Sequence, residues 1–389
     1  MQETSQDNLL ITFSWVLSAT KYIFSGTPMT TTAQIDSVWS DFLISENAQF
    51  DDNGKITTFG NTELERFSIK NGPVFTSLTH QALIKVTGSE ALSFLQGQFS
   101  SDLNQVSDTK AQYSAYCDPQ GNVLANFLVF KYQGDLYLSF DGSLREAILK
   151  RLQMFIMRSD VQLEEVSKSL IQVGFAGEFT DLDMQHSLDT KVKETFECGM
   201  ISETGMENLL AIKVPGPYHK YALFGPTEEM ITVWKNLRNN GDVTNSFDWT
   251  LLDIAAGIAT VTSATSAQFT AQFFNLDKLE AINFKKGCFP GQEIIARIHY
   301  RGKVTKRTLR IHIDEALNLV PGDTLELKDP NNKTHKLTVI NSNPGVLEGT
   351  LCLAIATLKS LDAVEGELTT LTGSAVQIEP LPYSIKDEE

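Results

Sequence analysis

The stretch Phe284-Lys285-Lys286-Gly287-Cys288-Phe289-Pro290-Gly291-Gln292-Glu293 decides how this chain of 389 residues is interpreted. Its two glycines allow a positive φ or a close backbone approach, and Pro290 between them fixes one dihedral angle. The stretch therefore predicts a tight turn that carries a thiol. The lysines before Cys288 favour the thiolate, because an opposite charge nearby stabilises the ionised form. A buried, inert cysteine in the same turn is the simpler alternative, and the sequence leaves it open.

The motif Lys-Gly-Cys-aromatic-x-Gly-Gln-Glu at 286–293 resembles the signature of the YgfZ family of folate-binding proteins, which are relatives of the glycine-cleavage T-protein. An eight-residue motif with matching neighbours on both sides is more specific than a lone glycine pattern. The resemblance runs from about Thr76 to Tyr383 and is weakest between Ile171 and Phe247. The matching neighbours are Leu95-Gln96-Gly97-Gln98 with Asp102, Cys117-Asp118-Pro119-Gln120-Gly121, Asn275-Leu276-Asp277, Arg297, Arg301-Gly302-Lys303 and the stretch 378–384.

Local patterns predict an antiparallel α+β fold. Strand signals at 107–116 and 122–131 flank a turn at 118–121, and such hairpins do not build a doubly wound parallel sheet. After Lys306, short strand signals separated by Pro-Gly and Asn-Asn turns predict a small β-barrel. The resemblance implies a three-domain, T-protein-like cloverleaf. In it, two mixed α/β lobes and the C-terminal β-barrel surround a central opening that holds folate.

The predicted domains combine these patterns with the resemblance. We expect a discontinuous first lobe that carries the cysteine motif (29–168 plus 245–304), a second α+β lobe (169–244) and a C-terminal β-barrel (305–389). We interpret 1–28 as a start-site extension that is poorly ordered. Its apolar run from Leu9 to Leu17 follows acidic and polar residues, whereas a secretory signal begins with positive charge. A weak membrane anchor is the alternative for this segment.

Charge and cysteine content exclude several classes of protein. Lys and Arg number 32 against 48 Asp and Glu, and the net charge of −16 opposes attraction to nucleic-acid backbones and to anionic membranes. The four cysteines form no Cys-x-x-Cys pair, so the spacing supports neither a disulfide framework nor a metal site made by this chain alone. We therefore expect a cytoplasmic monomer with no membrane segment and no bound metal.

The resemblance offers three functional hypotheses, of which the first is a folate-dependent aminomethyltransferase. That family carries paired aspartates two residues after a Gly-Gly hairpin, and one of them is catalytic. At the matching place this chain has Ala125 and Asn126, and neither is an acid. General acid–base chemistry requires an ionisable group within reach. Asp118 precedes the turn and is more typical of a turn-forming residue than of a relocated catalyst. We therefore expect no classical turnover.

The second hypothesis, which we adopt, is a folate-binding accessory protein for iron–sulfur enzymes. The resemblance implies that tetrahydrofolate, or a one-carbon-substituted folate, supports the assembly or repair of certain clusters. The effect then reaches tRNA indirectly, through an iron–sulfur enzyme such as a tRNA methylthiolase.

The expected folate site combines the resemblance with the needs of a pterin. The resemblance places Trp249 in the folate site, and it places Gln81 where the family has a second tryptophan, so that stacking is weakened. A pterin needs an aromatic wall and a carboxylate for its amino-pyrimidine edge. We assign the wall to Trp249 and the carboxylate to Glu293, with Gln292 and Arg297 beside it. Core packing is the alternative for Trp249, because tryptophan is highly buried on average.

The third hypothesis is direct binding or modification of tRNA. Six basic residues cluster within 14 positions: Arg297, Arg301, Lys303, Lys306, Arg307 and Arg310. Basic residues with interleaved aromatics are one pattern of nucleic-acid binding. Against the net charge of −16, we do not expect direct contact with nucleic acid. We expect instead that Cys288, as a redox or group-transfer thiol, looks into the central cavity that holds the folate.

Overall fold

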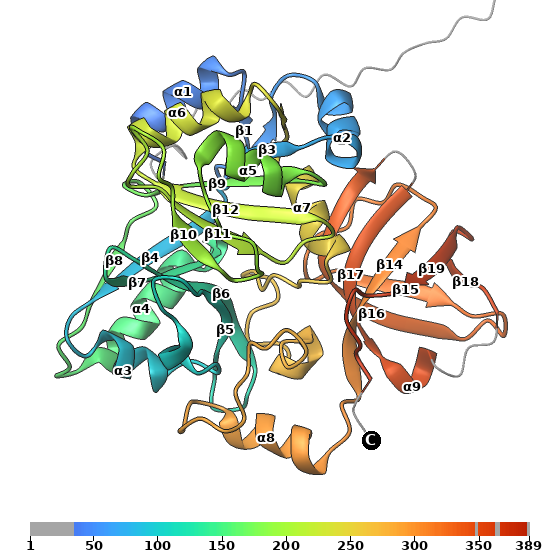
Figure 1. Ribbon diagram of the computed structural model, residues 1–389. Helices are drawn as coiled ribbons and strands as arrows, with labels where there is room; N and C mark the ends of the chain where they lie inside the picture. The colour runs from blue at the N-terminus through green and yellow to red at the C-terminus, as the bar shows by residue number, and fades with distance from the viewer. Residues whose placement is uncertain (1–34, 347–348, 362–365, 387–389) are drawn as a thin grey trace, which may run out of the picture.

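The computed structural model describes residues 35–346, 349–361 and 366–386, and the segment interpreted as an extension (1–28) lies outside them. Within these ranges the chain folds into three lobes around a common centre (Figure 1). A five-stranded sheet, a six-stranded sheet and a closed barrel form the three cores. The predicted cloverleaf with two mixed α/β lobes is therefore present. No helix in the described ranges is both long enough and apolar enough to span a bilayer.

The sheet of the first lobe has the order β5-β6-β7-β4-β8, and every neighbouring pair is antiparallel. Side chains of β6 alternate largely between buried and half-buried positions, as in a strand whose two faces differ. α3 (Ala91–Gln96) and α4 (Arg145–Ile156) belong to the same lobe and bury apolar residues into its core. The strands are β4 (Gln81–Thr87), β5 (Gln112–Cys117), β6 (Val123–Tyr132), β7 (Asp135–Asp141) and β8 (Gln162–Glu165). The hairpin expected around 118–121 is the β5–β6 pair.

The second lobe contains the six-stranded sheet in the order β10-β11-β12-β9-β3-β13. Only the short β13–β3 pair is parallel. The strands are β3 (Val74–Ser77), β9 (Ile171–Gly177), β10 (Cys198–Met200), β11 (Leu210–Val214), β12 (His219–Gly225) and β13 (Asp242–Val243). Its helices are α1 (Ser37–Ser45), α2 (Thr62–Asn71), α5 (Thr180–Leu188) and α6 (Thr227–Leu237), and α7 (Ser246–Ala255) runs from this lobe into the centre (Figure 1). The small β1–β2 pair (Gln49–Phe50 with Ile56–Thr58) connects α1 to α2.

One arrangement differs from the predicted domains. The segment before β4 was predicted to belong to the first lobe, but β3 pairs with β9, so that Val74 lies opposite Ala176 in the second sheet. The apolar face of α1 follows it there. Trp39 packs edge-on against Trp234 of α6, with ring centroids 5.6 Å apart. A helical pattern reveals which face of α1 is apolar but not which sheet will cover it, and the physical partner lies almost 200 positions away.

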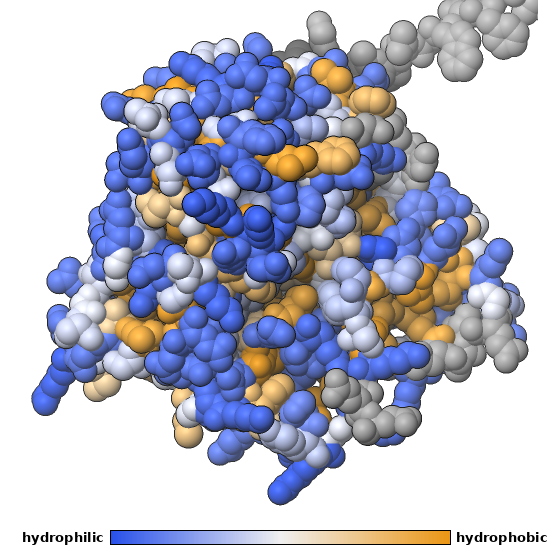
Figure 2. Space-filling model, in the orientation of Figure 1, coloured by the Kyte–Doolittle hydropathy of each residue, from blue (hydrophilic) through white to orange (hydrophobic). Residues whose placement is uncertain are grey.

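The C-terminal barrel is present as predicted, with the closed order β14-β17-β16-β15-β18-β19. Closure leaves no unpaired edge strand. Figure 2 shows hydrophobic residues gathered over the barrel, whereas most of the face drawn is hydrophilic. The strands are β14 (Lys306–Ile313), β15 (Thr324–Lys328), β16 (Thr334–Val346), β17 (Gly349–Thr357), β18 (Leu368–Thr370) and β19 (Ala375–Glu379), and the short α9 (Leu358–Leu361) follows β17.

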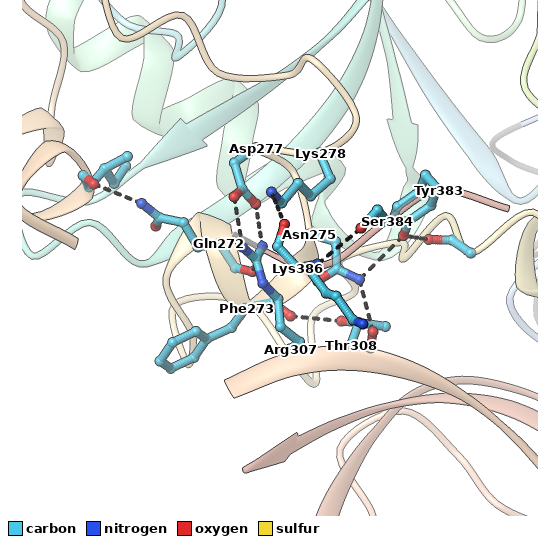
Figure 3. Close-up of polar contacts among 12 residues, drawn as sticks. Gln272, Phe273, Asn275, Asp277, Lys278, Arg307, Thr308, Tyr383, Ser384 and Lys386 are labelled. Carbon is cyan, nitrogen blue, oxygen red and sulfur yellow. Dashed lines mark hydrogen bonds and ion pairs between the residues drawn. The ribbon is translucent and has the colours of Figure 1, made fainter. Parts of the chain in front are cut away.

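A buried ion pair joins the barrel to the first lobe (Figure 3). Arg307 of β14 contacts both carboxylate oxygens of Asp277, at 2.5 and 3.0 Å, and it donates a further bond to the Gln272 carbonyl at 3.0 Å. The side chains of Arg307 and Asp277 are 0% and 8% exposed. Since a buried charge is costly unless it is paired in good geometry, this contact fixes where the barrel sits.

Neutral hydrogen bonds reinforce the same joint. Asn275 adopts a left-handed backbone conformation, with φ of 59°, at the end of a short 3₁₀ turn. Its side-chain amide donates to the Thr308 carbonyl at 2.8 Å and lies 3.3 Å from the Tyr383 hydroxyl. Tyr383 in turn donates to the Gly257 carbonyl. The Asn-Leu-Asp segment and the closing Pro-Tyr segment, which the resemblance brought together as family features, thus meet in one joint (Figure 3).

The Arg307–Asp277 pair makes a stability prediction. Asp277→Ala removes the carboxylate that contacts the buried Arg307 through both of its oxygens, so we expect the free energy of unfolding to fall by about 3–5 kcal/mol. Urea unfolding followed by circular dichroism measures this. Glu326→Ala is the matched control, since it breaks the Lys336–Glu326 pair, whose side chains are 68% and 31% exposed. The control should lose less than about 1 kcal/mol. Equal losses in the two variants would show that Arg307–Asp277 is no stronger than a surface pair.

Candidate functional site

A cavity of about 280 Å³ lies where the three lobes meet. Residues of β4, β6 and β7 line it from the first sheet, and residues of β12 line it from the second. The helix α7 contributes Phe247, Trp249 and Asp253, and the barrel contributes the connection 318–321 before β15. The volume is close to the lower end of the ~300–1,000 Å³ range of small-molecule sites. We therefore take this central cavity as the candidate binding site.

Trp249 borders the central cavity, as the resemblance implies, but its ring is already packed. Asn245 caps α7 by accepting hydrogen bonds from two N–H groups of the first turn. The indole lies so close to β9 that a Cβ on Gly174 would be 2.2 Å from it. Lys220 Nζ lies 5.1 Å from the ring centroid, and Trp249 is only 2% exposed. The indole therefore supports the wall and offers little free ring surface, so the core-packing alternative fits its environment.

Lys220 carries a buried charge that α7 compensates. Its ammonium forms an ion pair with the carboxylate of Asp253, one helical turn after Trp249. Asp253 also faces Tyr113, whose pKa is raised chiefly by burial and further by this negative charge. A cation over an aromatic ring and beside a carboxylate is favourably placed for both contacts. Lys220 is thus satisfied within the protein and serves to hold α7 against β12.

Phe247 is the ring of α7 that stays accessible. It is 38% exposed and lines the central cavity two residues before Trp249, whose indole packs against β9. The ammonium of Lys55, from the turn between β1 and β2, lies 5.7 Å from the Phe247 centroid. Sequence reasoning missed both residues, because nothing in the spacing of Lys55 links it to a helix that begins almost 200 positions later. The aromatic surface open to a ligand therefore belongs to Phe247 more than to Trp249.

A carboxylate lines the central cavity from the first sheet. Asp141, at the end of β7, lies directly opposite Gln81 of β4. Its Oδ1 accepts hydrogen bonds from the backbone N–H of Ser143, at 3.0 Å, and from the Ser143 hydroxyl. Within the described ranges, Oδ2 accepts no hydrogen bond from the protein. The Oδ2 atom of Asp141 thus remains available to accept a hydrogen bond from a ligand.

Gln81 lies in the cavity wall, where the resemblance places a second tryptophan. The Ser139 hydroxyl oxygen lies 3.0 Å from Gln81 Oε1 and 2.7 Å from Gln172 Oε1. A hydroxyl has one hydrogen to donate, so one of the two amides must present its NH₂ group to Ser139. A polar network therefore occupies this part of the wall. The weaker stacking that we expect from Gln81 stays a prediction.

His80 supplies an imidazole with an unpartnered nitrogen to the same cavity. Its Nδ1 is buried and has no hydrogen-bond partner among the residues that the structure describes. Burial, together with the positive charges of Lys55 and Lys220, lowers the pKa of His80 to about 3. The ring is therefore neutral at physiological pH, with one nitrogen as donor and the other as acceptor.

Asn126, one of the two residues at the place of the aspartate pair of the aminomethyltransferases, forms two hydrogen bonds with the backbone. Asn126 lines the central cavity, as expected for that position. Its NH₂ group donates to the Ala259 carbonyl and its carbonyl accepts from the Val261 N–H, each at 2.9 Å. Asn126 thus ties β6 to the segment that follows α7. The residue has no ionisable group, and its side-chain amide forms hydrogen bonds with backbone groups.

The cysteine motif forms the predicted tight turn, at the start of α8 (Gln292–Arg301). Gly291 has φ of 79°, and a Cβ there would lie 2.5 Å from the Asp118 carbonyl oxygen and 2.6 Å from Gly121 Cα. Two glycine-bearing turns, one from each family motif, therefore pack against each other. Cys288 is exposed on this turn, so the alternative of a buried cysteine is wrong. The other three cysteines are buried, and burial raises the pKa of Cys198 and Cys352 to about 12.

Lys286 forms hydrogen bonds that the sequence did not predict. Its ammonium donates to the backbone carbonyls of Gln96, Phe99 and Ser101, at 2.7, 2.6 and 2.8 Å. These carbonyls follow the C-terminus of α3, where orphan acceptors favour a cation. Burial lowers the pKa of Lys286 to about 8. We expected this lysine to stabilise a Cys288 thiolate, but its donors are directed to the α3 end instead.

The structure separates the cysteine motif from the central cavity. Cys288, Gln292, Glu293 and Arg297 are absent from its lining. Gln292 is turned back on the motif, with Nε2 3.4 Å from the Lys286 carbonyl oxygen, while Glu293 and Arg297 are exposed on α8. The expectations that Glu293 meets a pterin and that the thiol looks into the cavity are therefore corrected. The physical cause is the packing of Gly291 on the 118–121 turn, which directs α8 along the outside of the molecule (Figure 1).

Part of the predicted basic cluster is used inside the protein. Arg307 pairs with Asp277, and Arg310 pairs with Glu379 at 2.9 Å. Arg297, Arg301 and Lys303 are exposed. No group of three or more His, Cys, Asp or Glu side chains in the described part of the chain is placed to hold a metal ion.

Comparisons with known proteins agree with this fold. Residues 48–246 match the GCVT N-terminal domain. The chain is 29% identical to the tRNA-modifying protein YgfZ of Klebsiella pneumoniae (strain 342) over 313 residues, and 29% identical to the YgfZ of Escherichia coli O157:H7 over 315 residues. Each match covers 80% of this chain and 93% of the relative. The fold is similar to that of the glycine cleavage system aminomethyltransferase T from Bartonella henselae, with a TM-score of 0.72 at 13% identity, covering 88% of this chain and 96% of that one.

The neutral His80 predicts a pH dependence of stability. An unfolded chain takes up a proton on this imidazole near pH 6.5, whereas the folded protein does so only near pH 3. Stability from this residue is therefore complete above about pH 6.5 and is lost as the pH falls toward 3. Between pH 7 and pH 5, the wild type should lose about 2 kcal/mol more than His80→Gln.

Urea midpoints at a series of pH values measure this difference. His186→Gln, which removes an exposed imidazole of α5, controls for the loss of a histidine as such. Parallel pH profiles for the wild type and His80→Gln would contradict a buried, neutral His80.

Proposed function

This chain belongs to the YgfZ family of proteins with a GCVT N-terminal domain, and on that premise we propose that it binds tetrahydrofolate, or a one-carbon-substituted folate, in the central cavity. We further propose that it is an accessory protein for iron–sulfur enzymes that act in tRNA modification. When bound, a reduced folate supplies a carrier for one-carbon units. The observation that carries the proposal is a cavity at the meeting point of the lobes. It combines the accessible ring of Phe247 with the Asp141 carboxylate, one oxygen of which has no hydrogen-bond partner among the described residues.

The residues of the central cavity fit a pterin. Phe247 and the apolar side chains of β6 and β7 offer wall surface, and aromatic rings favour offset stacking on a flat bicyclic group. Asp141 Oδ2 is free to accept hydrogen bonds from an amino-pyrimidine edge. The Gln81 network adds further donors and acceptors. Polar groups that are few and convergent, within an otherwise apolar wall, are typical of sites that orient a small molecule.

The aminomethyltransferase hypothesis requires an acidic residue where this chain has Ala125 and Asn126. Asn126 cannot accept or release a proton, and its amide is committed to Ala259 and Val261. The other carboxylates of the cavity, Asp141 and Asp253, come from β7 and α7 and have structural partners. The site therefore supports binding of a folate better than aminomethyl transfer.

Direct recognition of tRNA is less well supported than folate binding. A groove of about 1,290 Å³ runs beside α8, and the stacked rings of Phe284 and His299, 3.7 Å apart, line it. Its charged lining includes Lys110 and Lys303 but also Asp102 and Glu280. A nucleic-acid groove would present mainly positive charge, because phosphate contacts dominate affinity. We therefore propose that the effect on tRNA is indirect.

Cys288 is placed for contact with another protein rather than with the folate. Its thiol is exposed on a turn that is held in position by the packing of Gly291 on Gly121 and by the Lys286 contacts. An accessible thiol on a fixed turn can form a mixed disulfide or a transient ligand bond with a partner. We propose that the two features act separately, with folate bound at the centre and the thiol presented to iron–sulfur enzymes at the surface.

Asp141 provides the sharpest test of the folate site. Asp141→Asn keeps a side-chain oxygen for Ser143 but removes the charge that we assign to the amino-pyrimidine edge, so tetrahydrofolate should bind at least tenfold more weakly. Calorimetric titration under anaerobic conditions measures the affinity. Asp160→Asn is the matched control, because Asp160 accepts from the N–H and hydroxyl of Ser89 in the same way, on the surface. Unchanged affinity in Asp141→Asn would remove this residue from the site.

The exposed thiol makes a cellular prediction. Cys288→Ser changes no described hydrogen bond or core contact, so it should fold with an unchanged unfolding midpoint. In cells that depend on this protein, it should lower tRNA methylthiolation by a cluster-dependent enzyme, as measured by mass spectrometry of tRNA nucleosides at matched protein levels. Full methylthiolation with Cys288→Ser would mean that the motif is only a scaffold for α8.

A further inference from the structure

The helix α8 turns one face away from the rest of the protein. Ile295 is its buried residue, and with 3.6 residues per turn the opposite side carries Glu293, Arg297, Tyr300 and Arg301. All four of these side chains are exposed, Tyr300 by 62%. The helix lies at the lower edge of the molecule in Figure 1. We call these four residues the α8 face.

The cations at this place have no acidic partner inside the protein. Among the described residues, no carboxylate lies within 4 Å of the side-chain nitrogens of Arg297, of Arg301, or of Lys303, which is exposed just after the helix. Elsewhere on the surface a lysine does find one, as Lys336 does in Glu326 at 2.7 Å. Acidic residues outnumber basic ones by 48 to 32 in this chain, so three neighbouring exposed cations without an acidic partner are unexpected.

The sequence around α8 reverses the charge of the whole chain. Between Glu280 and Asp314 there are eight Lys and Arg residues, and Glu293 is the one acidic residue. Arg297 and Arg301 are one turn apart, where like charges destabilise a helix. The helix dipole favours a cation in the last turn, which accounts for Arg301 but not for Arg297 in the middle of the helix. The fold of α8 does not require this arrangement, which therefore points to a negative charge outside the chain.

The composition of the α8 face favours a protein partner over nucleic acid. Arginine and tyrosine are enriched in protein interfaces, and Tyr300 offers an exposed ring between the two arginines. Nucleic-acid binders commonly make about 6–10 phosphate contacts, whereas the α8 face and Lys303 supply three cations beside the Glu293 carboxylate. A long polyanion would also meet the acidic remainder of the surface, but a small acidic patch would contact α8 alone.

We propose that the α8 face, together with Lys303, binds an acidic patch on the iron–sulfur enzyme that this protein serves. The inference rests on the proposed function and extends it by naming the surface and the charge of the partner. Cys288 stands on the turn that leads into α8, four residues before the helix begins. A partner on α8 therefore comes close to the exposed thiol. The α8 face contributes nothing to the lining of the central cavity, so docking does not compete with folate.

Binding of a purified partner tests the α8 face. The probe is the cluster-free tRNA methylthiolase of the same organism, and its affinity for the full-length protein is measured by biolayer interferometry. Arg297→Glu/Arg301→Glu reverses the charge of the face and should weaken binding by at least about tenfold. Arg297→Lys/Arg301→Lys retains the charge and should weaken binding by less than about threefold. Binding of the wild type should weaken as the salt concentration rises, because exposed charges are screened.

Lys150→Glu/Arg158→Glu is the matched control. Both residues are exposed, on α4 and just after it, so this variant changes the net charge by the same amount away from α8. Its affinity should stay within about twofold of wild type. Equal affinities of the wild type and Arg297→Glu/Arg301→Glu, or an equal loss in the control, would overturn the α8 face and leave the accessory role standing. A wild type that does not bind the methylthiolase would overturn both.

A parallel titration with total tRNA separates the two classes of partner. We expect no difference in tRNA binding between the wild type and Arg297→Glu/Arg301→Glu. If the charge reversal abolishes binding of tRNA and leaves the affinity for the methylthiolase unchanged, the face binds nucleic acid and the proposal is wrong. Unfolding midpoints of all variants confirm that the comparison is made between folded proteins.

Discussion

The buried contact between Arg307 and Asp277 is the charged part of the joint between the barrel and the first lobe, and the central cavity lies between lobes that such joints hold together. This contact attaches the first strand of the barrel to the loop that precedes the cysteine motif. The barrel then places 318–321 and the side chain of Asn341 against the segment after α7, where Asn341 Oδ1 accepts from the Thr260 N–H at 2.9 Å. The cavity has walls from all three lobes, so it depends on contacts between lobes rather than on any one core. A buried charge pair is a directional way to fix such a joint.

The separation of the cavity from the thiol changes how the family motif is understood. Lys286 holds the end of α3, Gln292 closes back on the turn, and Gly291 packs on the hairpin that carries Asp118 and Gly121. Most of the motif thus fixes the conformation of a turn at the outer side of the first lobe. Cys288 is exposed on this turn, as Gly287 and Glu293 are, and it is the exposed member that carries a thiol. The molecule therefore offers two chemically different surfaces: a mixed polar and apolar cavity inside, and a single presented sulfur outside.

Features encoded by near neighbours were predictable from the sequence. The β5–β6 hairpin, the barrel strands and the tight turn at Gly291 depend on turn residues and on local alternation, and the structure confirms them. The pairing of β3 with β9 was missed, because a short buried strand carries no information about its partner. Trp249 was correctly placed at the cavity, but the contacts that cover its ring come from Gly174 and Lys220, which no local pattern connects to it. Lys55, His80 and Asp141 were missed for the same reason. Asp141-Gly-Ser, at the end of β7, was the one available signal of a capping carboxylate.

A crystal structure of the protein soaked with tetrahydrofolate shows whether folate binds between the three lobes. We expect electron density for the pteridine inside the cavity between the lobes, with its amino-pyrimidine edge at Asp141 and its ring beside Phe247. We expect no folate at the cysteine turn. An empty cavity, together with ordered folate on α8 next to Cys288, would contradict the account and would restore the thiol to the binding site.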